Sequence, residues 1–136
     1  TFFMTYGDGV ADVDLHELLA SHKASGKEVT LTAVQPLGRF GALEIDDTNT
    51  VTSFTEKPLG DGNWINGGFF VCEPSAISRI ADDSTSWEAQ PLEALANDHQ
   101  LNAYQHYGFW QPMDTLRDKN QLEKLWKSNN APWRVW

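Results

Sequence analysis

The first 36 residues alternate between apolar and amphipathic segments, and this order restricts the fold more than any other feature of the chain. Residues 2–6 are apolar and aromatic and run into a Gly-Asp-Gly turn, which predicts a buried strand followed by a tight loop. Asp14 and Gly26 stand where a helix is normally capped and stopped. Apolar residues alternate with threonines from Val29 until Pro36, which predicts a second strand. The order strand, helix, strand indicates an α/β sheet.

The remaining residues continue this mixture of strands and helices. Two short strands at 42–46 and 51–55 flank a turn and predict a hairpin. Residues 64–72 predict a further strand, interrupted by Gly67-Gly68. The other expected elements are helices at 74–80, 87–97 and 115–127 and a strand at 101–106. The sequence therefore predicts one α/β domain over residues 1–136, with a mixed sheet and flanking helices.

The charge balance excludes several kinds of partner. Nineteen acidic residues outnumber ten basic ones in a chain of 136, which gives a net charge of −9. A nucleic-acid binder needs a basic surface, so neither nucleic acid nor an anionic membrane is expected as a partner. No apolar run approaches the ~20 residues that cross a bilayer. With Cys72 as the only cysteine, no internal disulfide can form, and a reducing, cytoplasmic setting is the simplest interpretation.

Two aspartates are candidate metal ligands. Asp8 follows an apolar strand, at the end of a sheet where α/β proteins usually place their ligands, but Asp-Gly is also a common turn. Asp114 precedes a helix and is equally suited to be its N-cap. Mg²⁺ commonly takes one or two protein carboxylates and leaves its other positions to water and phosphate. Each aspartate alone fits the structural role better, and the two together permit a metal site.

Three further residues could recognise a sugar phosphate. Pro58 keeps the preceding segment extended, so Glu56 could accept bonds from sugar hydroxyls while Lys57 meets a phosphate. An exposed ion pair at a strand end is the alternative. Asn66, followed by two glycines, could present its amide to a sugar, and the alternative is a β-bulge.

The histidines and tryptophans give weaker indications. The four histidines have no metal-ligand spacing, which favours surface or packing roles: His16, His22, His99 and His106. Three of the six tryptophans lie near the end of the sequence and indicate a tail that docks by aromatic burial, on this chain or on a partner: Trp126, Trp133 and Trp136.

Read in order, these segments resemble a known family. TYGDGVADVD at 5–14, GRFGALEID at 38–46, SFTEKP at 53–58, INGGFF at 65–70 and GFWQPMDTLRDK at 108–119 are together similar to the glucose-1-phosphate cytidylyltransferases. This family, also called CDP-glucose pyrophosphorylases, belongs to the sugar nucleotidyltransferases. The last of these motifs is the most specific, whereas EKP and GDG recur across the wider superfamily.

The resemblance implies a function for each candidate residue. Asp8 and Asp114 would hold a catalytic Mg²⁺, and Glu56 and Asn66 would bind the glucose. Lys57 would bind the sugar phosphate, and Gly41, whose role comes only from the resemblance, would bring backbone close to the hexose. Glucose 1-phosphate would attack the α-phosphorus of CTP and release pyrophosphate. The product, CDP-glucose, would serve the synthesis of dideoxy sugars for surface polysaccharides.

The sequence also departs from the family, whose members are about twice as long. It resembles only their C-terminal half and has no Gly-rich phosphate loop before a helix. The expected fold is therefore a partial Rossmann-like nucleotidyltransferase that lacks the nucleotide-binding half. We expect the isolated chain to be inactive, either as part of an enzyme that needs a complementary N-terminal half or as a non-catalytic sugar-phosphate-binding or oligomerisation module. An uncovered strand at residues 2–6 predicts a homo-oligomer.

Overall fold

The computed structural model describes residues 1–36, 38, 41–56, 59 and 63–135. Its strands are β1 (Phe2–Thr5), β2 (Gly9–Ala11), β3 (Val29–Val34), β4 (Ala42–Ile45), β5 (Val51–Thr55), β6 (Ile65–Cys72), β7 (Leu101–Gln105) and β8 (Trp110–Pro112). Its helices are α1 (Leu15–Ser25), the 3₁₀-helix η2 (Pro74–Arg79), α2 (Gln90–Asn97) and α3 (Leu116–Lys127). The expected mixed α/β fold with flanking helices is confirmed.

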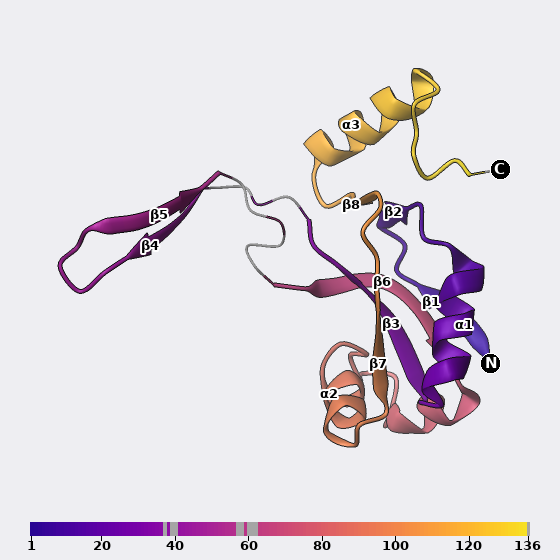
Figure 1. Cartoon of the computed structure of the whole chain (residues 1–136). Helices are drawn as coiled ribbons and strands as arrows, with labels where there is room; N and C mark the ends of the chain where they lie inside the picture. Colours follow the sequence, from indigo (N-terminus) through magenta and orange to yellow (C-terminus); the bar gives the residue numbers. More distant parts are fainter. Residues whose placement is uncertain (37, 39–40, 57–58, 60–62, 136) are drawn as a thin grey trace.

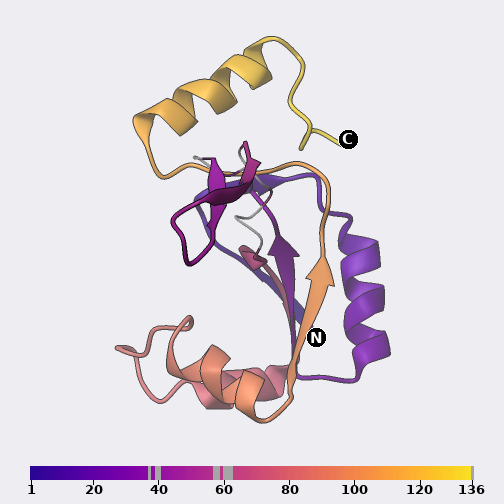
Figure 2. The same cartoon turned by 60° about the vertical axis from the view of Figure 1, so that its left-hand side comes forward.

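A four-stranded sheet in the order β1-β6-β3-β7 forms the centre of the molecule (Figure 1). β6 runs antiparallel to both of its neighbours, and β7 runs parallel to β3. Consequently β1, β3 and β7 are mutually parallel, and their carboxyl ends lie at the same end of the sheet. In Figure 2 the arrowheads of β3 and β7 point toward β8 and α3, which lie beyond this end.

Helices cover both faces of this sheet. α1 packs on one face, where Val13, Leu18 and Val71 form a buried cluster. η2 and α2 cover the other face around a second cluster, whose members are Val29, Phe70, Cys72, Ala76 and Leu95. Cys72 is a buried member of this second cluster, and burial raises the pKa of its thiol to about 11.

Helix α1 has the ends that the sequence predicted. The Asp14 carboxylate accepts bonds from the backbone N–H groups of His16 and Glu17, and Gly26 ends the helix with a φ of 63°. His22 is buried beneath this helix: Nδ1 lies 2.9 Å from the Thr30 hydroxyl and Nε2 lies 3.1 Å from the Glu73 carboxylate. His22 therefore ties α1 to β3 and to the end of β6, which confirms a packing role.

The expectation of a buried first strand was wrong. β1 lies at the edge of the four-stranded sheet and pairs only with β6 among the described residues. Phe2 and Phe3 are 37% and 49% exposed. The apolar character of residues 2–6 predicted burial, but whether a strand is covered depends on which elements pack on it, and no local pattern determines that.

Several other elements differ from the sequence prediction in extent or type. β2 and β8 pair with each other as a separate two-stranded ribbon, and neither was predicted, because three-residue strands rich in Gly and Pro have no measurable period. The helix after Pro74 is a 3₁₀-helix, and α2 begins at Gln90 with Pro91 in its first turn, as expected for proline.

Two elements project from the central sheet. The β4–β5 hairpin stands apart from it in Figure 1, and nearly all of its residues are exposed. α3 extends beyond β8 (Figure 2). Among the described residues, no helix combines the length and apolar character needed to cross a membrane.

Candidate functional site

The ribbon of β2 and β8 brings the two candidate metal ligands onto adjoining segments. Val10 pairs with Gln111, and the Met113 N–H donates to the Asp8 carbonyl at 2.6 Å. In this register Asp8 lies opposite Met113, one residue before Asp114. Pro112 occupies a position that makes no ladder bond, where its missing N–H costs nothing. Residues more than a hundred positions apart thus meet beyond the carboxyl end of β1.

Asp8 lies in the bend that joins β1 to β2, as its turn alternative predicted, whereas Asp114 does not cap α3. α3 is capped by Thr115, whose hydroxyl accepts from the Asp118 N–H at 3.2 Å, while the Asp118 carboxylate accepts from the Thr115 N–H at 3.0 Å. The alternative of Asp114 as the N-cap was therefore wrong. Asp8 and Asp114 are both exposed and make no side-chain hydrogen bond with other described residues.

The donor atoms and the exposure of these two carboxylates fit the requirements of Mg²⁺. They supply hard oxygen donors, which Mg²⁺ prefers, and they are accessible to water and phosphate. In the described ranges no third histidine, cysteine or acidic residue joins them in a cluster of three. A site with two protein ligands fits a metal that normally keeps several waters and substrate oxygens in its coordination shell.

Asn66 lies at a bulge in β6. Leu31 pairs with Phe70 and Ala33 pairs with Asn66, so that β3 has one residue between these pairs and β6 has three. Gly68, inside the bulge, has a φ of 77°. The Asn66 amide oxygen accepts from the Gly68 N–H at 2.9 Å, and its nitrogen donates to the Tyr6 hydroxyl at 3.0 Å. The β-bulge alternative is confirmed, and the bulge fixes the orientation of the amide.

Two aromatic residues that the sequence did not single out connect this bulge to the ribbon. The Trp110 indole N–H donates to the Gly67 carbonyl at 2.8 Å, so β8 is bonded directly to β6. Tyr6, at the end of β1, carries the hydroxyl that meets Asn66. The one signal that could have indicated them is position, since each lies inside a motif that already contained a candidate residue.

The environment of Tyr6 changes its acidity. Burial and a hydrogen bond to the Glu88 carboxylate raise the pKa of this phenol to about 12, although the Asn66 amide opposes the shift. Because an unfolded tyrosine titrates near ~10, folding stabilises the protonated phenol. Its contribution to stability is complete below pH ~10 and is lost as the pH rises through about 12.

Between pH ~10 and ~12 the free energy of unfolding of the wild-type chain should fall. We expect a smaller fall when phenylalanine replaces Tyr6. The phenolate absorbance of the folded chain should also lose its latest-titrating component in this variant. Denaturant unfolding at several pH values, together with absorbance titration, measures both effects. Tyr107→Phe is the matched control, since that ring is 78% exposed. Equal pH dependence in the two variants would contradict the assignment.

Gly41 and Glu56 lie together at the base of the β4–β5 hairpin. A Cβ added at Gly41 would lie 2.7 Å from the Phe54 ring and 3.3 Å from a Glu56 carboxylate oxygen, so a side chain there would require the exposed Phe54 ring to shift. Lys57 lies outside the described residues. The predicted residues therefore form two described groups, one at the hairpin and one at the ribbon and bulge.

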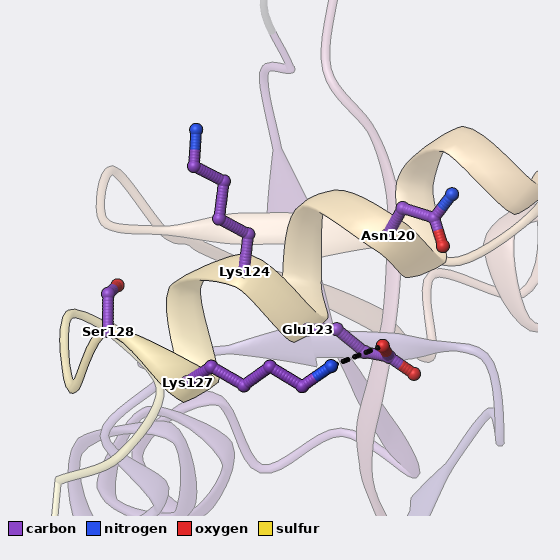
Figure 3. Close-up of a pocket in the computed structure, with 5 residues that line it drawn as sticks. All are labelled: Asn120, Glu123, Lys124, Lys127 and Ser128. Carbon is purple, nitrogen blue, oxygen red and sulfur yellow. Dashed lines mark hydrogen bonds and ion pairs between the residues drawn. The ribbon is translucent and has the colours of Figure 1, made fainter.

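Two hollows lie along α3. The first, shown in Figure 3, is lined by polar side chains of this helix and its C-cap alone, and Lys127 is paired with Glu123 there at 3.1 Å. The second is a groove of ≈ 440 Å³ between α3 and the ribbon, next to Met113. Its walls are mainly apolar and comprise Val10, Met113, Leu122, Glu123, Trp126, Lys127 and Trp133.

The aromatic tail docks on its own chain in part. Trp133 stacks on Phe109 with ring centroids 5.5 Å apart, and Arg134 lies over the Trp126 ring. Trp126 nevertheless remains 47% exposed, and Trp136 lies outside the described residues. The expected docking by aromatic burial is thus confirmed for Trp133.

A mixed sheet with helices on both faces makes this an α/β protein. The chain belongs to the nucleotidyl transferase family, whose model matches residues 1–131.

Similarity to individual proteins is consistent with this family. The glucose-1-phosphate cytidylyltransferase of Salmonella typhi is 58% identical over 135 residues, which cover 99% of this chain and 52% of that protein. The probable glucose-1-phosphate cytidylyltransferase of Bacillus subtilis is 39% identical and is covered to 53%. The chain thus spans about half the length of the curated relatives it matches.

Solved structures show the same fold in part. HddC of Yersinia pseudotuberculosis matches 88% of this chain and 52% of its own, with a TM-score of 0.58 and 21% identity. A putative glucose-1-phosphate thymidylyltransferase from Bacillus anthracis, crystallised with a sucrose, covers 98% of this chain with a TM-score of 0.57 and 15% identity. At this level of identity the similarity concerns the fold alone.

Proposed function

We propose that this chain is the sugar-phosphate half of an enzyme that makes CDP-glucose and pyrophosphate from CTP and glucose 1-phosphate. The pairing of β2 with β8 is the observation that carries the proposal, because it places Asp8 and Asp114 on adjoining segments. The 58% identity with the Salmonella enzyme supports the choice of substrate. The reaction would take place in the cytoplasm and serve polysaccharide biosynthesis.

Each described residue would have a distinct task. Asp8 and Asp114 would hold Mg²⁺, which when bound neutralises charge on the reacting phosphates. The Asn66 amide nitrogen donates one of its two hydrogens to the Tyr6 hydroxyl, and its second hydrogen would donate to a glucose hydroxyl. Glu56 would accept bonds from other hydroxyls beside the backbone of Gly41, and Lys57 would meet the sugar phosphate.

We further propose that nucleotide binding requires a complementary N-terminal half. The chain covers 52% of its Salmonella relative, and the described residues supply no second group of candidates for CTP. The isolated chain would then bind glucose 1-phosphate or CDP-glucose and yet catalyse no transfer of CMP.

Calorimetric titration of the purified chain with glucose 1-phosphate and with CDP-glucose tests this function. We expect binding that depends on Mg²⁺ and falls at least about tenfold in Asp114→Ala and in Lys57→Ala, because each removes a charged contact. Asp83→Ala and Lys23→Ala remove exposed charges elsewhere and should change nothing. The same samples are assayed for CMP transfer from CTP.

Three outcomes would contradict the proposal in different ways. No binding by a folded chain would exclude a sugar-phosphate site, and equal loss in the Asp83 control would exclude a specific one. CMP transfer by the pure chain would show that no second half is needed.

A second candidate function, assembly without catalysis, is favoured by the edge strand β1. This strand carries no charged side chain, Phe3 is 49% exposed, and among the described strands none pairs with the outer side of β1. Such an edge pairs readily with another strand, and two copies of β1 can meet antiparallel about a two-fold axis. We therefore propose that the isolated chain forms a homodimer or larger oligomer through β1.

Sedimentation velocity at micromolar concentration measures this assembly. We expect an oligomer for the wild-type chain and a shift toward monomer in Phe3→Lys, which places a charge on the edge. Ile77→Lys changes a residue of similar exposure, 57%, on η2 and should leave assembly intact. A monomeric wild-type chain would contradict the prediction.

A further inference from the structure

We infer that His106 and Asp12 form a positioning pair that fixes the register of the β2–β8 ribbon and thereby keeps Asp8 beside Asp114. His106 Nε2 lies 2.9 Å from the Asp12 carboxylate oxygen Oδ1 and 3.2 Å from the Phe109 carbonyl. The importance of this spacing rests on the proposed function of the two aspartates. The pair itself touches neither of them.

The two side chains stand at the junction between the central sheet and the ribbon. The His106 N–H donates to the Ala33 carbonyl at 2.9 Å, so the chain is still bonded to β3 at this residue. Asp12 directly follows β2, and its N–H donates to the Phe109 carbonyl at 3.1 Å. The contact between His106 and Asp12 therefore connects the central sheet with the end of the ribbon at which Asp12 bonds to Phe109.

The two contacts of Nε2 differ in kind. This nitrogen carries a hydrogen and donates to the Phe109 carbonyl, whereas Asp12 Oδ1 lies 2.9 Å from it without forming a hydrogen bond among the described residues. The His106 side chain is 9% exposed, and Asp12 Oδ1 is buried. A buried carboxylate oxygen is costly unless a polar or charged group lies beside it, and the His106 ring is the group that Asp12 Oδ1 meets here.

Gly108 is an independent sign that this contact is built into the fold. A Cβ at this position would overlap Asp12 Oδ1 and would lie 2.7 Å from the His106 ring. Its backbone passes so close to the pair that any side chain there would push the two apart. The position requires glycine because of this close approach.

The ribbon needs such an anchor because it is short. A two-stranded ribbon is marginal in water, and this one has three paired residues on each strand. A slip of one residue would turn every side chain of one strand to the other face. It would also move Asp8 away from Met113 and change its distance from Asp114. The bond from Trp110 to Gly67 attaches β8 alone, whereas Asp12 attaches β2.

Amide exchange and metal binding in Asp12→Ala, Asp12→Asn and Gly108→Ala test the inference. The Met113 N–H, bonded to the Asp8 carbonyl, reports the register at the far end of the ribbon. The Phe70 N–H, in the core strand β6, reports global stability. Broadening of the Asp8 and Asp114 signals by Mn²⁺, used alone as the probe, reports metal binding at these two residues. This binding weakens when the two carboxylates are not held side by side.

We expect Asp12→Ala and Gly108→Ala to speed exchange at Met113 by about tenfold or more while exchange at Phe70 changes little. Half-maximal broadening should then need a correspondingly higher Mn²⁺ concentration. Asp12→Asn keeps the size of the side chain and an oxygen dipole beside the His106 ring, and it should restore part of both values. His16→Gln, at an exposed histidine on α1, is the matched control.

Unchanged exchange at Met113 in Asp12→Ala would overturn the inference. Faster exchange with unaltered Mn²⁺ broadening would overturn it as well, because the pair would then hold the ribbon without placing the carboxylates. If Mn²⁺ broadens neither aspartate in the wild-type chain, the proposed metal site fails, and exchange at Met113 still decides whether the pair fixes the register.

Discussion

Replacing Phe70 by alanine is expected to lower the free energy of unfolding by about 3–5 kcal/mol. This ring is 1% exposed and lies in the cluster between β6, η2 and α2, where Tyr6 and Trp87 pack against it at centroid distances of 5.4 and 6.1 Å. Removing it leaves a cavity that surrounding strands cannot close. The loss would consume a large part of the ~5–15 kcal/mol that stabilises a typical domain.

Urea denaturation of Phe70→Ala beside Phe54→Ala measures this effect. The control removes the same atoms from a ring that is 63% exposed on the β4–β5 hairpin, so we expect a change within about 0.5 kcal/mol. Similar losses in the two variants would show that the core does not centre on Phe70, or that the hairpin is covered in solution.

Replacing Gly68 by alanine is expected to cost about 1–3 kcal/mol in backbone strain. Its φ of 77° is rarely adopted by residues with a side chain. The added Cβ would also lie 2.8 Å from Cδ2 and 3.2 Å from Cγ of Tyr6, atoms near the backbone that cannot move aside easily. Both effects act on the bulge that orients Asn66, so binding of glucose 1-phosphate should weaken as well.

Gly7→Ala is the matched control, because a Cβ there meets no atom within 4 Å. Denaturant unfolding gives the stability change, and calorimetry gives the change in sugar-phosphate binding. If the two glycine variants are equally stable, the bulge adapts to a side chain, and the account of Gly68 is wrong.

The sequence predicted those parts of the fold that depend on short-range chemistry. Asp14 and Gly26 indicated both ends of α1, because a carboxylate at an N-cap and a glycine at a left-handed position act within a few residues. The hairpin and the strand at β6 followed from local patterns in the same way. Thr115 was missed as the cap of α3 because Asp114 beside it is an equally good candidate from sequence alone.

The candidate site depended on long-range pairing and was predictable only as separate residues. Nothing local to Asp8 or Asp114 indicates that β2 pairs with β8, and resemblance to a family supplied the reason to consider them together. The contacts of Trp110 with Gly67 and of Tyr6 with Asn66 were not foreseen, because each joins segments far apart in the chain. The local apolar pattern missed the exposure of β1 for the same reason, and only the absence of the family's N-terminal half predicted an uncovered strand there.

The strand order of the central sheet has a consequence for synthesis on the ribosome. β6 is the antiparallel partner of both β1 and β3, with Phe2 opposite Cys72 and Val34 opposite Ile65. Among the described strands, β1 and β3 therefore have no neighbour to pair with until β6 has left the exit tunnel. Pairings of this kind make folding slow, because the entropy cost of closing long loops comes before the stabilising contacts form. In a chain limited to these residues, we expect the apolar side chains of β1 to stay uncovered until β6 is available.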